Sequence, residues 1–420
     1  MNKYIVLLVL LSYHVASAFA QENHFARAER VYALFVDNQG DSIHALLSKK
    51  LQGELSPVVF KDMFLQTERQ FGKLQSAGEW QKEDAQGITL YYRDLVFERY
   101  SLRFLLSFDA DGCMNTIRLV PVPAASTAKP VAYDKSRLEE RGVTVGVDGF
   151  KLPGTLTLPV GKKKVPVVVL VHGSGPQDRD ETLGPNKPFR DLAWGLAERG
   201  IATLRYDKRT KVYGNSFVPQ GREADYDTEC VDDAVSAVRL ASGLPEVDAG
   251  KVYVLGHSLG ATLAPRIAER ADGLAGVILV AGLVRPLEDA MREQMAYLAS
   301  LTNSPVDEEQ LAEIKRQVPP SYWEAASAYK PVEVAAKLTL PMLVLQGERD
   351  YQVTMEDFGL WRMGLLRHKN AFFKSYPKLN HLLQEGSGKS TPFEYNHASP
   401  VPAYVMDDIA SFVTTATLLH

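Results

Sequence analysis

The sequence has few cysteines, and no residues in it are spaced like a metal site. Only 2 cysteines occur among 420 residues, Cys113 and Cys230. They fall in different predicted domains, so we expect two separate thiols rather than a disulfide. No cysteine or histidine cluster has metal-ligand spacing, no glycine loop is of the phosphate-binding kind, and no repeat is present. The sequence therefore predicts neither a metal nor a cofactor.

A strong charge bias and a long internal apolar segment are also missing. The formal net charge is −4, which gives no reason to expect a nucleic acid or an anionic membrane as partner. After the first residues no segment offers about twenty consecutive apolar residues, so we expect no integral membrane segment there. With 45% hydrophobic and 23% charged residues the composition is that of a globular protein. The length exceeds that of one usual core and favours two domains.

The first twenty residues have the pattern of a secretory signal peptide. Lys3 gives a short positive start, residues 4–11 are apolar, and Ala18-Phe19-Ala20 is a small-x-small cleavage site before Gln21. The residue directly after that site is Gln21 and not a cysteine, so a bacterial lipid anchor is not indicated. We expect a periplasmic or secreted protein after removal of residues 1–20, with an uncleaved anchor as the alternative.

The most informative local pattern is Gly256-His257-Ser258-Leu259-Gly260, which we call the elbow. It follows the apolar run 251–255 and precedes the small-residue stretch 261–264, so a strand, a sharp turn and a helix are predicted with serine at the bend. The two glycines remove side chains that would block the close approach of helix and strand. The helix N-terminus then offers unpaired N–H groups beside the serine. An ordinary helix cap is the alternative role for Ser258.

Three further predicted strands end in chemically useful residues. The first ends in a loop that can offer a second backbone N–H, the second ends in acidic residues, and the third is followed by a histidine. The strands and the residues after them are 167–171 with His172-Gly173-Ser174-Gly175-Pro176, 342–346 with Gly347-Glu348-Arg349-Asp350, and 371–376 with Leu379-Asn380-His381.

Ser258, Asp350 and His381 therefore each follow the carboxyl end of a predicted strand, where open α/β sheets place their sites. A serine hydroxyl is a poor nucleophile by itself, and a neutral imidazole can take its proton and later return it to a leaving group. A carboxylate behind the imidazole holds the useful tautomer. These residue types suit acyl transfer.

From about Asp134 onward the chain resembles a bacterial α/β-hydrolase of the esterase and serine-aminopeptidase-like group. The resemblance implies that Ser258 is the nucleophile, Asp350 the orienting acid and His381 the general base. It also implies an oxyanion hole formed by the backbone N–H groups of Ser174 and Leu259. The motifs that carry it are 172–180, Arg205-Tyr206-Asp207-Lys208-Arg209, the elbow, 346–353 and 379–381.

Several residues near these motifs allow more than one role. Glu348 is a rival of Asp350 for the acid. His257 occupies the variable position of the elbow, where packing is the expected role, and His172 is expected to shape the loop 172–176. The charged residues 207–209 are expected to form an ion-pair network below the site, with substrate binding as the alternative.

Four parts are expected along the chain. They are the signal peptide 1–20, a small α+β domain 21–122, a linker 123–133 rich in alanine and proline, and an α/β-hydrolase domain 134–420. The small domain resembles one that precedes the hydrolase in some secreted bacterial homologues, and a homodimer through it is a further expectation. Its predicted helices lie between Ala26 and Phe71, and its predicted strands are 88–92, 96–100, 102–108 and 114–120.

The second domain is expected to begin with an antiparallel lead-in and to continue as a mostly parallel sheet with helices on both faces. The lead-in strands are 143–147 and 154–158. A charged helical insertion over about 283–338 is expected to form a lid. Its aromatic residues Tyr322, Trp323 and Tyr329 either line a substrate pocket or pack against the core.

These patterns predict a serine hydrolase that cleaves a small-molecule carboxylic ester through an acyl-enzyme intermediate. A serine peptidase of the same fold is the chief alternative, because the same residues serve amide cleavage. A binding protein with a vestigial triad is a further alternative.

Overall fold

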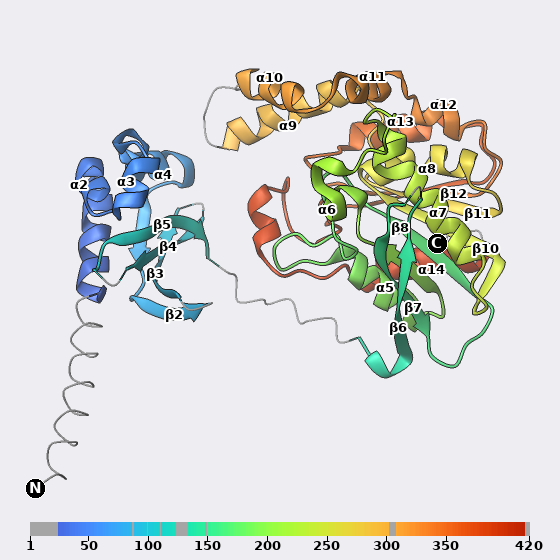
Figure 1. The fold of residues 1–420 in the computed structure, drawn as a ribbon, viewed down its shortest axis with the longest axis horizontal. Helices are drawn as coiled ribbons and strands as arrows, with labels where there is room; N and C mark the ends of the chain where they lie inside the picture. Colours follow the sequence, from blue (N-terminus) through green and yellow to red (C-terminus); the bar gives the residue numbers. More distant parts are fainter. Residues whose placement is uncertain are drawn as a thin grey trace, which may run out of the picture. The chain divides into compact units, whose positions relative to one another are not determined.

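The computed structural model describes residues 24–85, 88–98, 100–109, 111–122, 133–147, 149–301 and 308–415. The predicted signal peptide lies outside these residues, as does the predicted linker except for Tyr133. The described residues divide into two compact units, one within 24–122 together with 299–301, and one within 133–298 together with 308–415. Figure 1 gives the labels of their elements.

The first unit packs helices on one face of an antiparallel sheet. Phe35, in a helix over residues 24–36, stacks its ring 4.9 Å from that of Phe104 on the sheet. Within the described residues the sheet has five strands in the order β1-β3-β4-β5, with β2 also paired to β3. The further elements are α2 (Gly40–Ala45), α3 (Lys49–Glu54), η1 (Pro57–Phe60), α4 (Met63–Phe71), β1 (Leu74–Ala77), β2 (Gln81–Ala85), β3 (Ile88–Phe97), β4 (Ser101–Phe108) and β5 (Met114–Pro121).

The sequence prediction was wrong about the middle of this sheet. We expected separate strands over 88–92 and 96–100, but β3 runs unbroken from Ile88 to Phe97. The charged residue Arg93 does not break the strand because its guanidinium lies 4.4 Å from the centre of the Tyr32 ring and pairs with Glu29. A half-buried arginine can thus continue the alternation of the strand.

The second unit contains a mixed sheet of eight strands in the described part of the chain. Their order is β13-β12-β11-β10-β8-β9-β7-β6. The six strands from β13 to β9 are parallel to one another, and β7 pairs antiparallel with both β9 and β6, as the predicted lead-in requires. The strands are β6 (Leu138–Val145), β7 (Leu152–Pro159), β8 (Val165–Val171), β9 (Ala202–Tyr206), β10 (Val247–His257), β11 (Leu274–Val280), β12 (Met342–Gly347) and β13 (Ala371–Tyr376).

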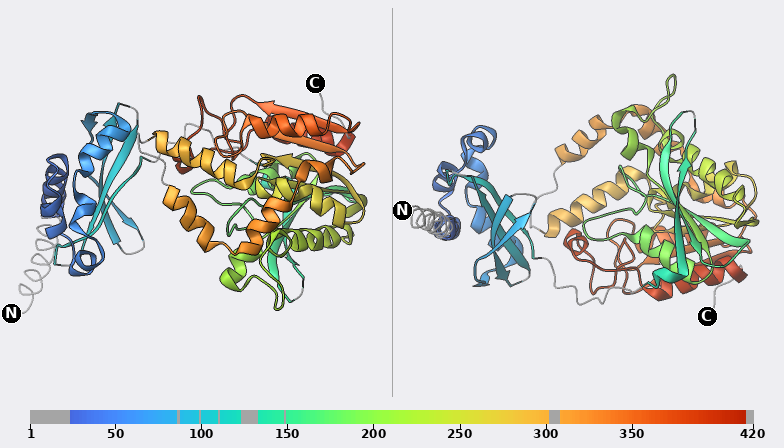
Figure 2. Two further views of the ribbon diagram at one scale, coloured as in Figure 1. Left: turned by 90° about the horizontal axis from the view of Figure 1, so that it is seen from above. Right: turned by 60° about the horizontal axis from the view of Figure 1, so that its bottom comes forward.

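Helices cover both faces of this sheet (Figure 2), which confirms the predicted architecture. The side chains of β8 alternate, so that Val167 and Val169 join the core with α7 (Asp232–Ser242) and α8 (Leu259–Arg270). The opposite face packs on α5 (Pro188–Glu198) and α14 (Ala403–Thr415).

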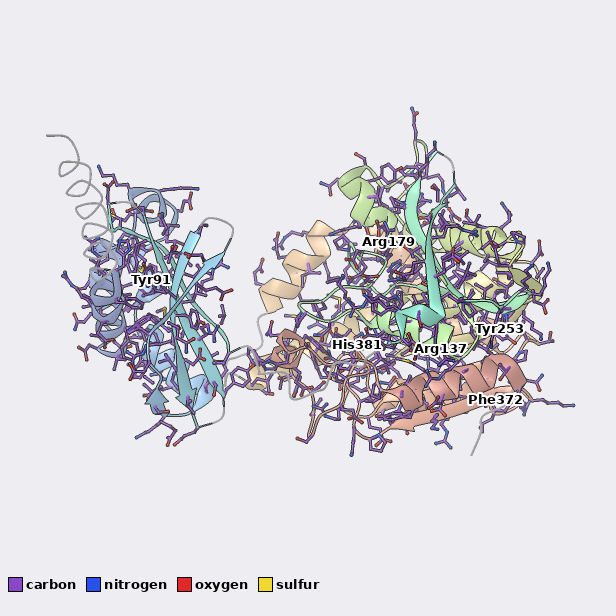
Figure 3. All side chains as sticks on the ribbon, turned by 90° about the horizontal axis from the view of Figure 1, so that it is seen from below. Tyr91, Arg137, Arg179, Tyr253, Phe372 and His381 are labelled. Atoms are coloured by element: carbon purple, nitrogen blue, oxygen red, sulfur yellow. The ribbon has the colours of Figure 1, made fainter. Side chains whose placement is uncertain are left out.

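On that opposite face, Tyr253 and Phe372, labelled in Figure 3, place their rings 6.0 and 6.1 Å from that of Phe412 in α14. Both β10 and β13 therefore pack against α14. The loops after β8, β10, β12 and β13 leave the sheet at its carboxyl edge, because these strands are parallel.

Between β11 and β12 the chain forms the helical insertion that was predicted over about 283–338. It contains α9 (Leu287–Leu301), α10 (Glu308–Gln317), α11 (Pro320–Ala328) and α12 (Pro331–Ala335). The remaining short elements are η2 (Lys135–Arg137), α6 (Arg209–Tyr213), η3 (Gly214–Ser216), the π-turn η4 (Asp227–Val231), α13 (Met355–Gly364) and η5 (Pro392–Asn396). No helix in the described ranges is both long enough and apolar enough to cross a membrane.

Candidate active site

Ser258 lies at a strained turn between β10 and α8. Its backbone angles are φ 53° and ψ −116°, a conformation that residues with a side chain rarely adopt. A Cβ atom on Gly256 would lie 2.1 Å from the carbonyl oxygen of Gly260, and one on Gly260 would lie 2.2 Å from that of Val171. Only glycine therefore allows strand and helix to approach closely enough to form this turn.

The two candidate oxyanion donors flank Ser258. Leu259 is the first residue of α8, whose opening N–H groups have no carbonyl partner within the helix. Ser174 lies in the loop 172–176, which we call the oxyanion loop. A Cβ on Gly173 in this loop would lie 3.1 Å from the Cβ of Ser258, so loop and serine are in contact distance. The Gly173 N–H donates to Glu181 at 2.7 Å, so this N–H of the loop is already occupied within the protein.

Asp350 and His381 form a buried pair after β12 and β13. The Nδ1 atom of His381 lies 2.6 Å from Oδ2 of Asp350. The other carboxylate oxygen accepts the backbone N–H groups of Gln352 at 2.7 Å and Val353 at 3.1 Å. The aspartate and the histidine are only 3% and 5% exposed, and Figure 3 labels the histidine.

Glu348, the other candidate for the acid, is not beside the histidine. Its side chain is exposed and accepts a hydrogen bond from the hydroxyl of Ser375 at 2.7 Å. Two residues along the same loop thus have opposite environments, and the buried one, Asp350, contacts the imidazole.

Ser258 opens onto a cavity of about 520 Å³ beneath the helical insertion. The walls are mostly apolar, and Tyr322 and Trp323 of α11 are among them, whereas Tyr329 packs on Tyr226 with ring centres 6.3 Å apart. The lining residues are Ser174, Gly175, Thr210, Phe217, Ala224, Tyr226, Glu229, Ser258, Leu259, Thr262, Leu283, Leu287, Met291, Gln294, Ile314, Val318, Pro319, Tyr322, Trp323, Gln352 and Val353.

The charged residues 207–209 form ion pairs next to this cavity, as expected. Asp207 accepts two hydrogen bonds from the guanidinium of Arg179, which Figure 3 labels. Arg209 makes a similar bidentate pair with Asp233 at 2.7 and 2.6 Å. All four side chains are engaged within the protein, which favours a structural role over substrate binding.

Lys208 has a more central position. Its ammonium pairs with Glu229 of the π-turn η4 and donates to the carbonyl oxygen of Gly173 at 2.9 Å. The second carboxylate oxygen of Glu229 accepts from the hydroxyl of Tyr322 at 2.6 Å. The insertion is therefore joined through an ion pair to the oxyanion loop.

Sequence reasoning missed Glu181 and Glu229, which complete the surroundings of the site. Glu181 directly follows the motif 172–180, but its partner His257 is far away in the chain, so no spacing rule could connect them. Glu229 and Tyr322 are 93 positions apart. A buried carboxylate of this kind has no periodic signature in the sequence.

The buried histidines around the site are engaged with the protein itself. Burial lowers the pKa of His172 to about 4, so its ring is neutral and packs edge-on against Tyr206 at 5.2 Å. His257 contacts Glu181 through one ring nitrogen and the backbone of His381 through the other. Among the residues that the structure describes, no group of three or more His, Cys, Asp and Glu side chains could hold a metal ion.

Comparison with known proteins identifies relatives of this chain. Residues 190–397, which include Ser258, Asp350 and His381, match the prolyl oligopeptidase family. Esterase EstD of Thermotoga maritima is 35% identical over 381 residues, which are 88% of this chain and 90% of that protein.

Solved structures that match this chain have lower sequence identity. Est1E of Butyrivibrio proteoclasticus is 18% identical with a TM-score of 0.46 and covers 66% of this chain and 98% of its own. The acylaminoacyl peptidase of Pyrococcus horikoshii is 14% identical with a TM-score of 0.47 and covers 82% of this chain and 50% of its own.

Proposed function

The chain belongs to the same family as Esterase EstD, and its residues 190–397 match the prolyl oligopeptidase family of α/β-hydrolases. From this we propose that it hydrolyses carboxylic esters through an acyl-serine intermediate. The observation that carries this proposal is the placement of Ser258 at a strained turn that opens onto the cavity. The buried Asp350–His381 pair and the two flanking loops support it.

The proposed reaction has two halves that use the same groups. The hydroxyl oxygen of Ser258 attacks the ester carbonyl carbon while its proton passes to Nε2 of His381. The bond to the alcohol oxygen then breaks, and that oxygen leaves with the proton. Water next attacks the acyl carbon with His381 again accepting a proton, and Ser258 is released as the carboxylic acid departs. Asp350 keeps the hydrogen of the imidazole on Nδ1, so that Nε2 stays free to accept.

The negative charge that forms on the carbonyl oxygen needs fixed donors. We assign these to the backbone N–H groups of Ser174 and Leu259, the second of which lies at the positive end of the α8 dipole. Removing one such donor typically costs on the order of 3 kcal/mol of transition-state stabilisation. The loops that present them therefore matter as much as the triad.

The cavity favours an uncharged and largely apolar acyl or alcohol group. Its walls are mainly aliphatic and aromatic, and Glu229, a charged side chain among them, already has Lys208 as its counter-ion. Each CH₂ group transferred from water into such a site contributes about 0.8 kcal/mol. We expect kcat/KM of nitrophenyl esters to rise by up to about fourfold per added CH₂ from acetate to hexanoate, and a flat profile would contradict this assignment.

The decisive test is covalent labelling with a fluorophosphonate probe. We expect wild-type protein to be labelled on Ser258, and Ser258→Ala to lose both labelling and about 10⁶-fold in kcat. Ser236→Ala is the control and should keep both properties, because the hydroxyl of Ser236 donates to the carbonyl oxygen of Gly146 and this residue does not line the cavity. Labelling of a different serine would refute the proposal, and faster turnover of aminoacyl amides than of esters would make the protein a peptidase.

The location of the protein and the role of the first unit are proposals too. We place the protein in the periplasm or outside the cell, on the basis of the signal-peptide pattern in residues 1–20. We assign the first unit an accessory role, because the candidate catalytic residues all lie in the second. N-terminal sequencing of the exported protein should begin at Gln21, and an intact N-terminus would contradict the cleavage.

A further inference from the structure

His257, the residue before the proposed nucleophile, connects parts of the site that lie on different loops. Its ring is only 6% exposed and lies with its centre 4.7 Å from that of His381. The Nε2 atom of His257 donates to the backbone carbonyl oxygen of His381 at 2.9 Å. On the other side, Nδ1 of His257 lies 2.9 Å from Oε2 of Glu181.

Glu181 extends this connection to the oxyanion loop. Its carboxylate is 4% exposed, and Oε1 accepts the backbone N–H of Gly173 at 2.7 Å. Glu181 also has a φ of +53°, in the left-handed region that non-glycine residues avoid. Asp178 holds this turn, because its side chain accepts the N–H groups of Asp180 at 3.1 Å and Thr182 at 3.0 Å. A strained residue that is held this firmly in a site suggests that its position serves the chemistry.

Charge also couples the two side chains. Nε2 of His257 donates to a carbonyl oxygen, and Nδ1 lies 2.9 Å from the Glu181 carboxylate, a distance at which an ion pair forms when the imidazole is protonated. Although burial by itself lowers the pKa of His257, the neighbouring Glu181 carboxylate raises it above the ordinary value. Burial likewise opposes ionisation of Glu181, but the positive charge that His257 can carry beside it holds the pKa of Glu181 below the usual range. Each member of the pair therefore stabilises the charged form of the other.

We propose that Glu181 and His257 are positioning residues, which hold the backbone of the general base and the backbone of the oxyanion loop in one fixed relation to Ser258. This inference rests on the proposed ester hydrolysis. It explains why a side chain in the variable position of the elbow is buried and paired rather than merely packed.

The geometry indicates what would be lost without the pair. The Gly173 backbone is held from two sides, since Glu181 binds its N–H and Lys208 binds its carbonyl oxygen. The carbonyl oxygen of His381 accepts from His257. A displacement of about 1 Å of a group that orients the reaction can cost about 10²-fold in rate. Loss of either link should therefore slow the chemical step more than it weakens substrate binding.

The test uses full-length protein and two pairs of variants. His257→Leu keeps the volume of the side chain but removes the donor, while His257→Gln retains an amide that can donate to His381. Glu181→Leu removes the acceptor, while Glu181→Gln keeps an oxygen for the Gly173 N–H and removes the charge. We expect the two leucine variants to lower kcat for nitrophenyl butyrate 10- to 100-fold with KM changed less than threefold. On a logarithmic scale, we expect the glutamine variants to recover between about a third and about two thirds of the activity that the leucine variants lose.

A spectroscopic reading separates positioning from general destabilisation. The proton between His381 and Asp350 should give a far-downfield proton NMR signal, because the two atoms lie 2.6 Å apart. We expect this signal to shift or broaden in His257→Leu. The control is Asp408→Asn, which removes a buried carboxylate that binds Lys374 and Tyr376, away from the cavity lining. It should lower the melting temperature and leave both kcat and the signal unchanged.

The outcomes distinguish this inference from the proposed function. Suppose that the probe labels Ser258 in the wild-type protein, and that folded His257→Leu is labelled and hydrolyses the ester at rates within threefold of wild type. The positioning role is then wrong, and the hydrolase proposal stands. Equal losses in the leucine and glutamine variants would also overturn the positioning role. If the leucine variants do not fold, the comparison of Glu181→Gln with wild type decides, since a kcat within twofold would refute a role for the charged pair.

Discussion

Replacement of Asp350 by asparagine tests the hydrogen-bond geometry of the triad. In the wild type one carboxylate oxygen accepts two backbone N–H groups, from Gln352 and Val353, and the other faces Nδ1 of His381. Asparagine has a single side-chain oxygen. The two backbone donors require that oxygen on their side, so the amide NH₂ is forced to face the histidine.

An NH₂ group in that place donates to Nδ1 of His381 and drives the ring hydrogen onto Nε2. The imidazole then presents an N–H to Ser258 and cannot accept its proton. A wrong tautomer of this kind reduces kcat by about 10⁴-fold in serine hydrolases, which corresponds to about 5.4 kcal/mol of transition-state stabilisation at 1.36 kcal/mol per tenfold. Substrate binding does not use Asp350, so KM should change only a few-fold.

The assay is steady-state hydrolysis of nitrophenyl butyrate by Asp350→Asn, with a thermal unfolding scan to show that the protein is folded. Glu348→Gln is the matched control, because this exposed carboxylate binds only Ser375 among the contacts seen and should keep wild-type kcat. A kcat for Asp350→Asn within tenfold of wild type would refute the tautomer argument. A large loss in Glu348→Gln instead would assign the acid to the other carboxylate.

Three further predictions follow from burial and close contacts. Lys208→Met should lower the free energy of unfolding by about 3 to 5 kcal/mol, because it leaves Glu229, which is 7% exposed, without its counter-ion. The double variant with Glu229→Gln should recover most of the lost free energy in denaturant unfolding. Gly260→Ala should lower the free energy of unfolding by about 4 kcal/mol or more and abolish turnover, because the new Cβ would lie 2.2 Å from a carbonyl oxygen. A folded and active variant would show that the elbow can relax. Cys113 and Cys230 are both unpaired in the described structure, and burial raises the pKa of the Cys230 thiol to about 12. Alkylation of the native protein without reduction should therefore modify Cys113 first, and Cys230 only after unfolding.

The sequence by itself determined the order and chemistry of the site. Apolar β-branched runs such as 167–171 can only be satisfied as buried strands, and the glycines of the elbow permit one backbone path. Because parallel strands deliver their carboxyl ends to a single edge, Ser258, His381 and the two carboxylates Glu348 and Asp350 could be expected close together from their places after strands. Local pattern is enough for these conclusions, since each depends on only a few consecutive residues.

Other features were decided by tertiary structure alone. Glu348 and Asp350 are nearly adjacent and chemically alike, and only the path of the loop after β12 buries one of them against His381. The strand β3 continues through Arg93 because Tyr32 and Glu29, on a helix far back in the chain, receive the guanidinium.

The same holds for the groups that surround the proposed nucleophile. Glu181 meets His257, and Glu229 meets both Lys208 and Tyr322, across long separations in the chain. The free energy of such a buried polar contact depends on distance and on exclusion of water, and both are set when helices and strands pack together. A sequence pattern records which side chains are present, whereas the partner of each buried charge is fixed only by the folded arrangement.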